Sequence, residues 1–347
     1  MEDKSYVLTP AVRLLVSLAA FVVIVAGMRA SQPLLVPFLL SLFIAVIAAA
    51  PLFYLKEKGV PGGIAMLLVI LLIVIIAMLM GWMIGGSLND FTANLPKYQE
   101  RLSGQSASLV TWLSGWGLQL DQEMIKNIIN PGKAMAMAGL VISGLGNVLT
   151  QSVLILITVI FMLIEASAFQ AKIHTIADDP AASVKRIDAV TSSIKRYMTI
   201  KTSTSLLTGV LISLWLWVLE VDYPVLWGLV AFLFNYVPNI GSIIAAVPAV
   251  LLALVQADPQ TALWVAVGYL VVNNLVGNMI EPRFMGTGLG LSPLVVFVSL
   301  VFWGYVLGPV GMFLSVPLTM TLKIFFDSYD ATHRIGLLLG GAIKQQG

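Results

Sequence analysis

The chain has 347 residues, of which 59% are apolar and only 10% are charged. Soluble domains carry about 25% charged residues, so this chain lacks the polar material to cover a soluble globule, which indicates an integral membrane protein. Its 19 basic and 17 acidic residues are too balanced for a nucleic-acid-binding surface, and the absence of Cys excludes a disulfide scaffold and a cysteine nucleophile.

Segment lengths predict the membrane spans, because a hydrocarbon core of about 30 Å needs about 20 helical residues. We expect an all-α integral membrane protein with about seven to eight transmembrane segments. The predicted apolar segments, in chain order, cover residues 12–28, 34–50, 64–84, 140–164, 206–219, 224–255, 262–280 and 293–326. The chain then divides into a three-helix membrane region at 1–85, a polar extramembrane helical insert at 86–145, a fourth span with a basic segment at 146–201, a transport region at 202–326 and a tail at 327–347.

The distribution of Lys and Arg predicts the orientation, because basic loops stay on the cytoplasmic side. Residues 167–201 hold six basic and three acidic residues. We therefore expect this segment and both termini in the cytoplasm, and residues 86–145 outside.

Two apolar segments are too long for one span each. Residues 224–255 would form a straight helix of about 48 Å, and residues 293–323 are similar in length. Each is interrupted near its middle, and the candidate hinge residues are Pro238, Gly241, Gly308, Pro309 and Gly311. Two interpretations stay open: kinked spans, or re-entrant helical hairpins that enter from opposite faces, the layout of alternating access around a central site.

Amide side chains cluster beside the first interruption and in the following span. The candidate substrate-pathway residues are Asn235, Asn239, Asn273, Asn274 and Asn278. Carboxamides donate and accept hydrogen bonds, which suits a neutral, hydroxylated ligand. The alternative role is hydrogen bonding between helices, worth about 1 kcal/mol or less per pair in membranes.

A charge pair, Glu281 and Arg283, borders the apolar C-terminal half. It could serve as a gate, a ligand clamp or a proton-linked carboxylate, but we favour a locally neutralised pair at the membrane interface. The fifth span begins with a run of hydroxyl residues whose default role is bonding to helix carbonyls. These residues are Thr202, Ser203, Thr204, Ser205 and Thr208.

No cofactor, metal site or enzymatic activity is expected. The two histidines, His174 and His333, lie in polar segments, and neither HExxH nor GxSxG occurs. GxxxxGKS and GxxxxGKT motifs are also absent, so this chain encodes no ATP-driven pump.

Several motifs of the C-terminal half resemble the autoinducer-2 exporter (AI-2E) family of bacterial membrane proteins. They are LWGLVAF at 226–232, NYVPNIGS at 235–242, EPRFMG at 281–286 running into GLGLS at 288–292, GPVGM at 308–312 and SVPL at 315–318. The resemblance implies an inner-membrane exporter of autoinducer-2, a small polyhydroxylated signal, which assembles as a homo-oligomer with a pentamer as one candidate.

Two other functions remain open. The first is a Na+(Li+)/H+ antiporter, which needs a titratable carboxylate within the membrane, and Glu281 is the candidate. The second is a non-transporting membrane scaffold that binds a partner through residues 86–145. An interior rich in Asn and poor in acids favours the neutral polar solute.

Overall fold

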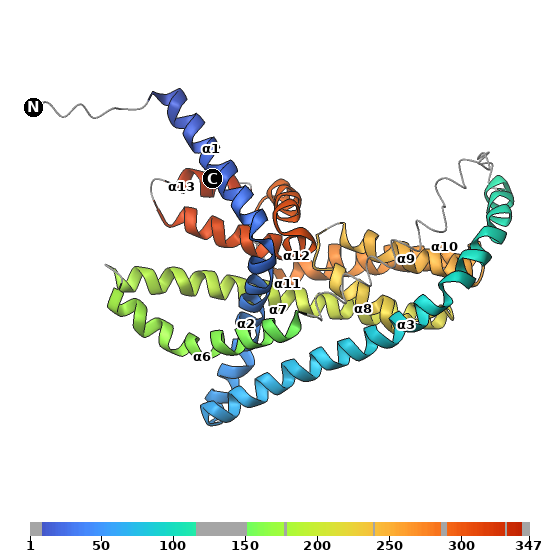
Figure 1. Ribbon diagram of the computed structural model, residues 1–347, viewed down its shortest axis with the longest axis horizontal. Helices are drawn as coiled ribbons and strands as arrows, with labels where there is room; N and C mark the ends of the chain where they lie inside the picture. The colour runs from blue at the N-terminus through green and yellow to red at the C-terminus, as the bar shows by residue number, and fades with distance from the viewer. Residues whose placement is uncertain are drawn as a thin grey trace, which may run out of the picture.

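The computed structural model describes residues 9–115, 151–176, 179–238, 240–285, 290–329 and 332–341, which are helical apart from short turns (Figure 1). The all-α prediction is therefore confirmed. Six of the described helices are long and apolar enough to cross a membrane, and three shorter apolar helices accompany them. Together they confirm a multi-span membrane protein.

The first three helices match the predicted N-terminal spans. They are α1 at Pro10–Ala30, α2 at Gln32–Glu57 and α3 at Gly62–Gly115. Helix α3 does not end near residue 84, where the sequence turns polar, but continues for 54 residues, about 81 Å. The backbone N–H and C=O groups of a helix are hydrogen-bonded within the helix both inside and outside the membrane. A change in side-chain polarity therefore does not require the helix to end. Its polar half packs against α8 and α9, and Asn94 Nδ2 donates to Tyr223 Oη at 3.3 Å.

The next two helices are α6 at Ser152–Ile176 and α7 at Pro180–Val218. The first part of the predicted fourth span, up to residue 150, lies outside the described residues. Helix α7 starts well before the predicted span at 206–219, since Asp179 caps it by accepting from the Ala182 N–H at 3.0 Å. It contacts α2, α6, α8, α10 and α12, and Figure 1 shows it running through the middle of the molecule.

The first interrupted segment is a helical hairpin. It comprises α8 at Pro224–Phe234, a turn whose described residues are 235–238 and 240, and α9 at Gly241–Gln256, and the two helices pack against each other. With 11 and 16 residues they extend about 16 and 24 Å, so neither crosses a 30 Å core. Gln256 closes the base, because its amide accepts from the Asp222 N–H at 2.8 Å and donates to the Glu220 carbonyl at 2.9 Å. We call residues 224–256 hairpin 1.

The second interrupted segment, α12 at Pro293–Asp327, also folds back on itself. Gly308 has φ 68° and ψ −153°, a non-helical conformation that favours glycine. Across this break, Trp303 Nε1 donates to Thr319 Oγ1 at 3.0 Å, although 16 residues would separate them by about 24 Å in a straight helix. We call residues 293–327 hairpin 2. The geometry of both segments favours hairpins over kinked spans.

The remaining helices connect and close the two hairpins. Helix α10 at Pro259–Asn273 continues into the π-helix η1 at Asn274–Ile280 and then into α11 at Glu281–Met285. The short helix α13 at His333–Leu339 packs on α12, and the Leu339 carbonyl accepts from the Ser292 N–H at 3.1 Å. This contact holds the C-terminal helix against the start of hairpin 2.

The contact between α7 and α8 predicts a site where adding one methyl group is costly. A Cβ on Gly228 would lie 1.8 Å from Ser213 Oγ and 2.5 Å from the Gly209 carbonyl oxygen. We expect Gly228→Ala to destabilise the protein by about 1–3 kcal/mol, the usual cost of overpacking. Thermal unfolding of the detergent-purified protein measures this. The control, Gly27→Ala, has nothing within 4 Å of the new methyl group and should melt no lower than the wild type. Equal melting temperatures for Gly228→Ala and the wild type would refute the close packing.

Candidate functional site

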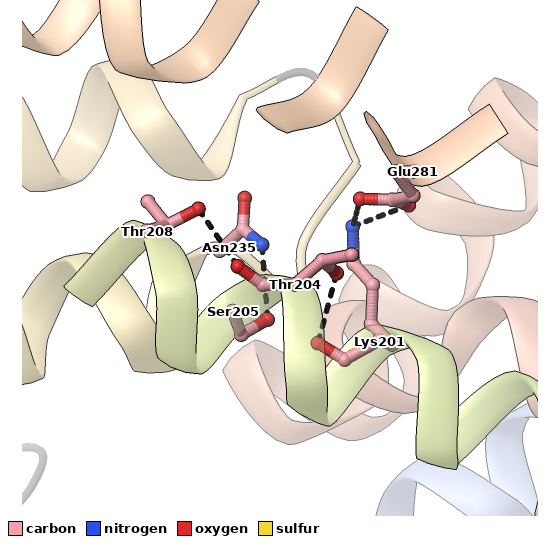
Figure 2. A network of polar contacts seen from close by, with 6 residues as sticks. All are labelled: Lys201, Thr204, Ser205, Thr208, Asn235 and Glu281. Carbon is pink, nitrogen blue, oxygen red and sulfur yellow. Dashed lines mark hydrogen bonds and ion pairs between the residues drawn. The ribbon is translucent and has the colours of Figure 1, made fainter. Parts of the chain in front are cut away.

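A stripe of polar side chains lies on one face of α7, within its path through the apolar core. Lys201, Thr204, Ser205 and Thr208 are all buried, and we call these four residues the α7 polar stripe. Their spacing of three, four and seven residues places them on one helix face. Figure 2 shows them pointing toward the turn of hairpin 1 and toward α11. Buried polar groups in an apolar membrane-spanning helix are rare and mark candidate functional sites.

Two hydroxyls of the stripe bond to their own helix. Thr204 Oγ1 donates to the Lys201 carbonyl at 3.1 Å, and Thr208 Oγ1 donates to the Thr204 carbonyl at 3.0 Å. The same role was expected from the sequence, because Ser and Thr in membrane helices commonly satisfy themselves in this way.

Ser205 instead connects the stripe to hairpin 1. Asn235 Nδ2 donates to Ser205 Oγ at 2.9 Å, and both side chains are buried. Asn235 is the first residue after α8, so this bond fixes the turn of hairpin 1 against α7. The amide oxygen of Asn235 has a second hydrogen-bonding capacity that this contact does not use.

Lys201 forms an ion pair with Glu281 at the other end of the stripe. The ammonium nitrogen lies 2.8 Å from Oε1 and 2.9 Å from Oε2, and the two side chains are 7% and 13% exposed (Figure 2). The prediction that Glu281 is neutralised by Arg283 is therefore wrong, because the partner of Glu281 is Lys201. Residues two apart on a helix point in different directions, and Arg283 is exposed.

Sequence reasoning missed Lys201 as a site residue. It was counted with the basic cluster at 167–201 that predicts the cytoplasmic side. The available signal was its register, because Ser205 and Thr208 follow it at four and seven residues, the spacing of one helix face.

Tyr236 joins hairpin 1 to hairpin 2. Its ring stacks on Phe313, with 4.3 Å between the ring centroids, and its hydroxyl lies 2.6 Å from Thr202 Oγ1 of α7. The turn of hairpin 1 therefore contacts both α7 and the second arm of hairpin 2.

The predicted hinge residues occupy the two turns. Gly241 allows a close approach, since a Cβ there would lie 1.8 Å from the Phe234 carbonyl oxygen. A Cβ on Gly311 would lie 2.0 Å from the Trp303 carbonyl oxygen. Pro238 lies within the first turn and is half-buried, and Pro309 directly follows the break at Gly308.

The five predicted amides do not form one hydrogen-bonded set in the described residues. Asn278 Nδ2 donates to Asn274 Oδ1 at 2.8 Å, and Asn274 Nδ2 donates to the Leu270 carbonyl at 3.0 Å. Both lie exposed on η1, whereas Asn235 is buried against α7, and Asn273 is half-buried. Asn239 lies outside the described residues.

Comparisons with known proteins give a consistent result over nearly the whole chain. A family model described as the AI-2E family transporter matches residues 18–331. The AI-2 transport protein TqsA of Escherichia coli (strain K12) is 36% identical over 96% of this chain and 97% of its own length. A putative transport protein of Haemophilus influenzae is 39% identical over 94% of this chain and 96% of its own, and the putative transport protein YhhT of Escherichia coli (strain K12) is 33% identical over 94% of each.

Proposed function

The chain belongs to the AI-2E family of transporters and is a multi-pass membrane transport protein rather than an enzyme, and from this premise we propose that it exports autoinducer-2. The name of the TqsA relative, AI-2 transport protein, assigns AI-2 to that protein. The observation that carries the proposal here is the contact of the hairpin 1 turn with the α7 polar stripe, through Asn235 and Ser205. A small hydroxylated solute loses its hydration on entry and needs neutral donors and acceptors in return, which an amide and hydroxyls supply.

The two hairpins would act as the gates. If hairpin 1 enters from outside and hairpin 2 from the cytoplasm, their turns approach the middle of the membrane from opposite faces. Movement of one hairpin against α7 then opens the site to one side while the other hairpin closes it. The substrate-pathway amides and the hinge residues named above are the parts of this mechanism that we propose.

A second candidate is a Na+(Li+)/H+ antiporter. The observation that favours it is the carboxylate of Glu281, which is only 13% exposed beside the helices that would line the pathway. This carboxylate already holds an ammonium group on both of its oxygens. The neutral solute therefore ranks first.

The membrane setting completes the proposal. We place the chain in the bacterial inner membrane with both termini in the cytoplasm and residues 86–145 outside. The apolar stretch of α1 has no buried residue, so it needs lipid or a second copy of the chain beside it. This exposure agrees with assembly into a homo-oligomer, with a pentamer as one candidate.

Export from proteoliposomes tests the function directly. Purified protein in vesicles loaded with labelled autoinducer-2 should release it without ATP. Ser205→Ala removes the partner of Asn235 at the cost of about one hydrogen bond, or about 1 kcal/mol, so the apparent KM should rise by about three- to tenfold. Ser203→Ala is the matched control, because Ser203 is exposed on the same helix and bonds only to the Thr199 carbonyl in the described contacts.

Two results would count against this proposal. Wild-type vesicles that release no autoinducer-2 above protein-free vesicles would reject the substrate. Equal KM values for the Ser205 and Ser203 variants would reject the placement of the site on the α7 polar stripe.

Cysteine labelling in intact cells tests the orientation, and the chain contains no native Cys to interfere. Lys185 lies exposed in the basic half of α7, and Gln260 lies exposed just after the base of hairpin 1. An impermeant maleimide should label Gln260→Cys in intact cells and Lys185→Cys only after permeabilisation. Labelling of Lys185→Cys in intact cells would invert the proposed topology.

A further inference from the structure

The ion pair between Lys201 and Glu281 has the geometry of a filled cation site. The ammonium nitrogen of Lys201 contacts both oxygens of the carboxylate, at 2.8 and 2.9 Å. The side chains of Lys201 and Glu281 are 7% and 13% exposed, so hydration by water stabilises either charge only a little. A carboxylate at such a position in a membrane protein must be balanced by a proton, a bound cation or a basic side chain.

The surroundings of Glu281 indicate that Lys201 is the group that balances its negative charge. Helix α11 packs against α7 and η1, and η1 consists of NLVGNMI, which has no ionisable side chain. From α7, Lys201 contacts the carboxylate directly, and the buried Tyr197 interacts with it electrostatically. Arg283, on α11 itself, is exposed. Lys201 is therefore the cation that compensates Glu281.

We propose that Lys201 is a built-in counter-cation, which occupies on Glu281 the position that a coupling Na+ would otherwise take and so makes transport independent of Na+. A tethered ammonium is present at high effective concentration at its own carboxylate, and it cannot be carried across the membrane. While the pair is intact, Glu281 binds no cargo cation. The inference rests on the proposed export of a neutral solute and names the residue that determines its ion independence.

The position of the pair fits this role. Lys201 lies one helical turn before Ser205, which holds Asn235 at the turn of hairpin 1. The pair cancels both charges beside the proposed solute site, and the neighbouring amide and hydroxyls stay neutral. A neutral solute then meets no uncompensated charge at this end of the site, since an unpaired charge there would carry a large desolvation cost.

The pair also joins two parts of the chain that 80 residues separate. Lys201 belongs to α7, and Glu281 is the first residue of α11, directly after the π-helix. Removing the ammonium leaves a buried, uncompensated carboxylate. Such a carboxylate acquires affinity for a small monovalent cation, because the cation restores the lost compensation.

Binding of radioactive Na+ to the purified full-length protein tests the inference without any transport substrate. At alkaline pH, the wild type and the exposed control Lys195→Gln, also on α7, should show no saturable Na+ binding. Their melting temperatures should be equal in NaCl and in choline chloride of the same ionic strength. Lys201→Gln should bind Na+ saturably, and a saturating concentration should raise its melting temperature by about 5 °C. The double variant Lys201→Gln/Glu281→Gln should lose both responses.

Two outcomes would overturn the inference. One is saturable Na+ binding by the wild type that Glu281→Gln abolishes, because Glu281 would then be a native cation site. The other is a Lys201→Gln protein that folds but shows no response to Na+. If Lys201→Gln does not fold, Na+ binding by the wild type and by Glu281→Gln decides whether Glu281 is a native cation site. No arm of this experiment uses autoinducer-2. If the Na+ results are as expected but the protein does not export autoinducer-2, the proposed substrate is rejected and this inference stands.

Discussion

The absence of water in the hydrocarbon core is the constraint on which this structure depends. Each backbone N–H and C=O in that region needs a partner within the protein, so a broken helix must be sheltered by other helices. The described residues contain two such breaks, one at the turn that follows α8 and one at Gly308. The first is enclosed by burial of Asn235, Tyr236 and Val237 and is bonded internally, since the Gly241 N–H donates to the Val237 carbonyl at 3.2 Å. The second is closed by the packing of the two arms of hairpin 2 on each other.

Helix α7 provides this shelter and also the polar groups of the site. Its 39 residues run from a basic segment into an apolar one, and the α7 polar stripe begins where the two meet. Ser205 holds hairpin 1, Thr202 contacts Tyr236, and Lys201 holds α11 through Glu281. The contacts that stabilise the breaks are therefore the same contacts that a moving hairpin has to exchange. In this account, stability and transport depend on one face of one helix.

The two interruptions could be predicted from sequence because their evidence is local, whereas the choice between kinked spans and hairpins stayed open. Segments of 31 and 32 residues are too long for one span, and proline and glycine interrupt both near the middle. Whether such a segment bends or folds back depends on contacts between its own arms, such as Trp303 with Thr319. Those contacts become visible only in the structure.

The partners within the site could not be predicted, because they lie far apart along the chain. Glu281 pairs with a lysine 80 residues away, and Asn235 bonds to a serine 30 residues away. No periodicity in one helix identifies the facing residue on another. The extent of α7 was also missed, because a hydropathy window detects its apolar end and not the polar residues that continue the same helix.

The central claim is that hairpin 1 and hairpin 2 must move relative to each other during transport. Tyr236 and Phe313 are the residues through which they stack, with 4.3 Å between the ring centroids. The most direct measurement is export by the variant Tyr236→Cys/Phe313→Cys in proteoliposomes, before and after a reversible cross-linker joins the two thiols. The account predicts that export stops on cross-linking and returns on reduction, while each single-cysteine variant is unaffected by the reagent. Undiminished export by the fully cross-linked protein would contradict it.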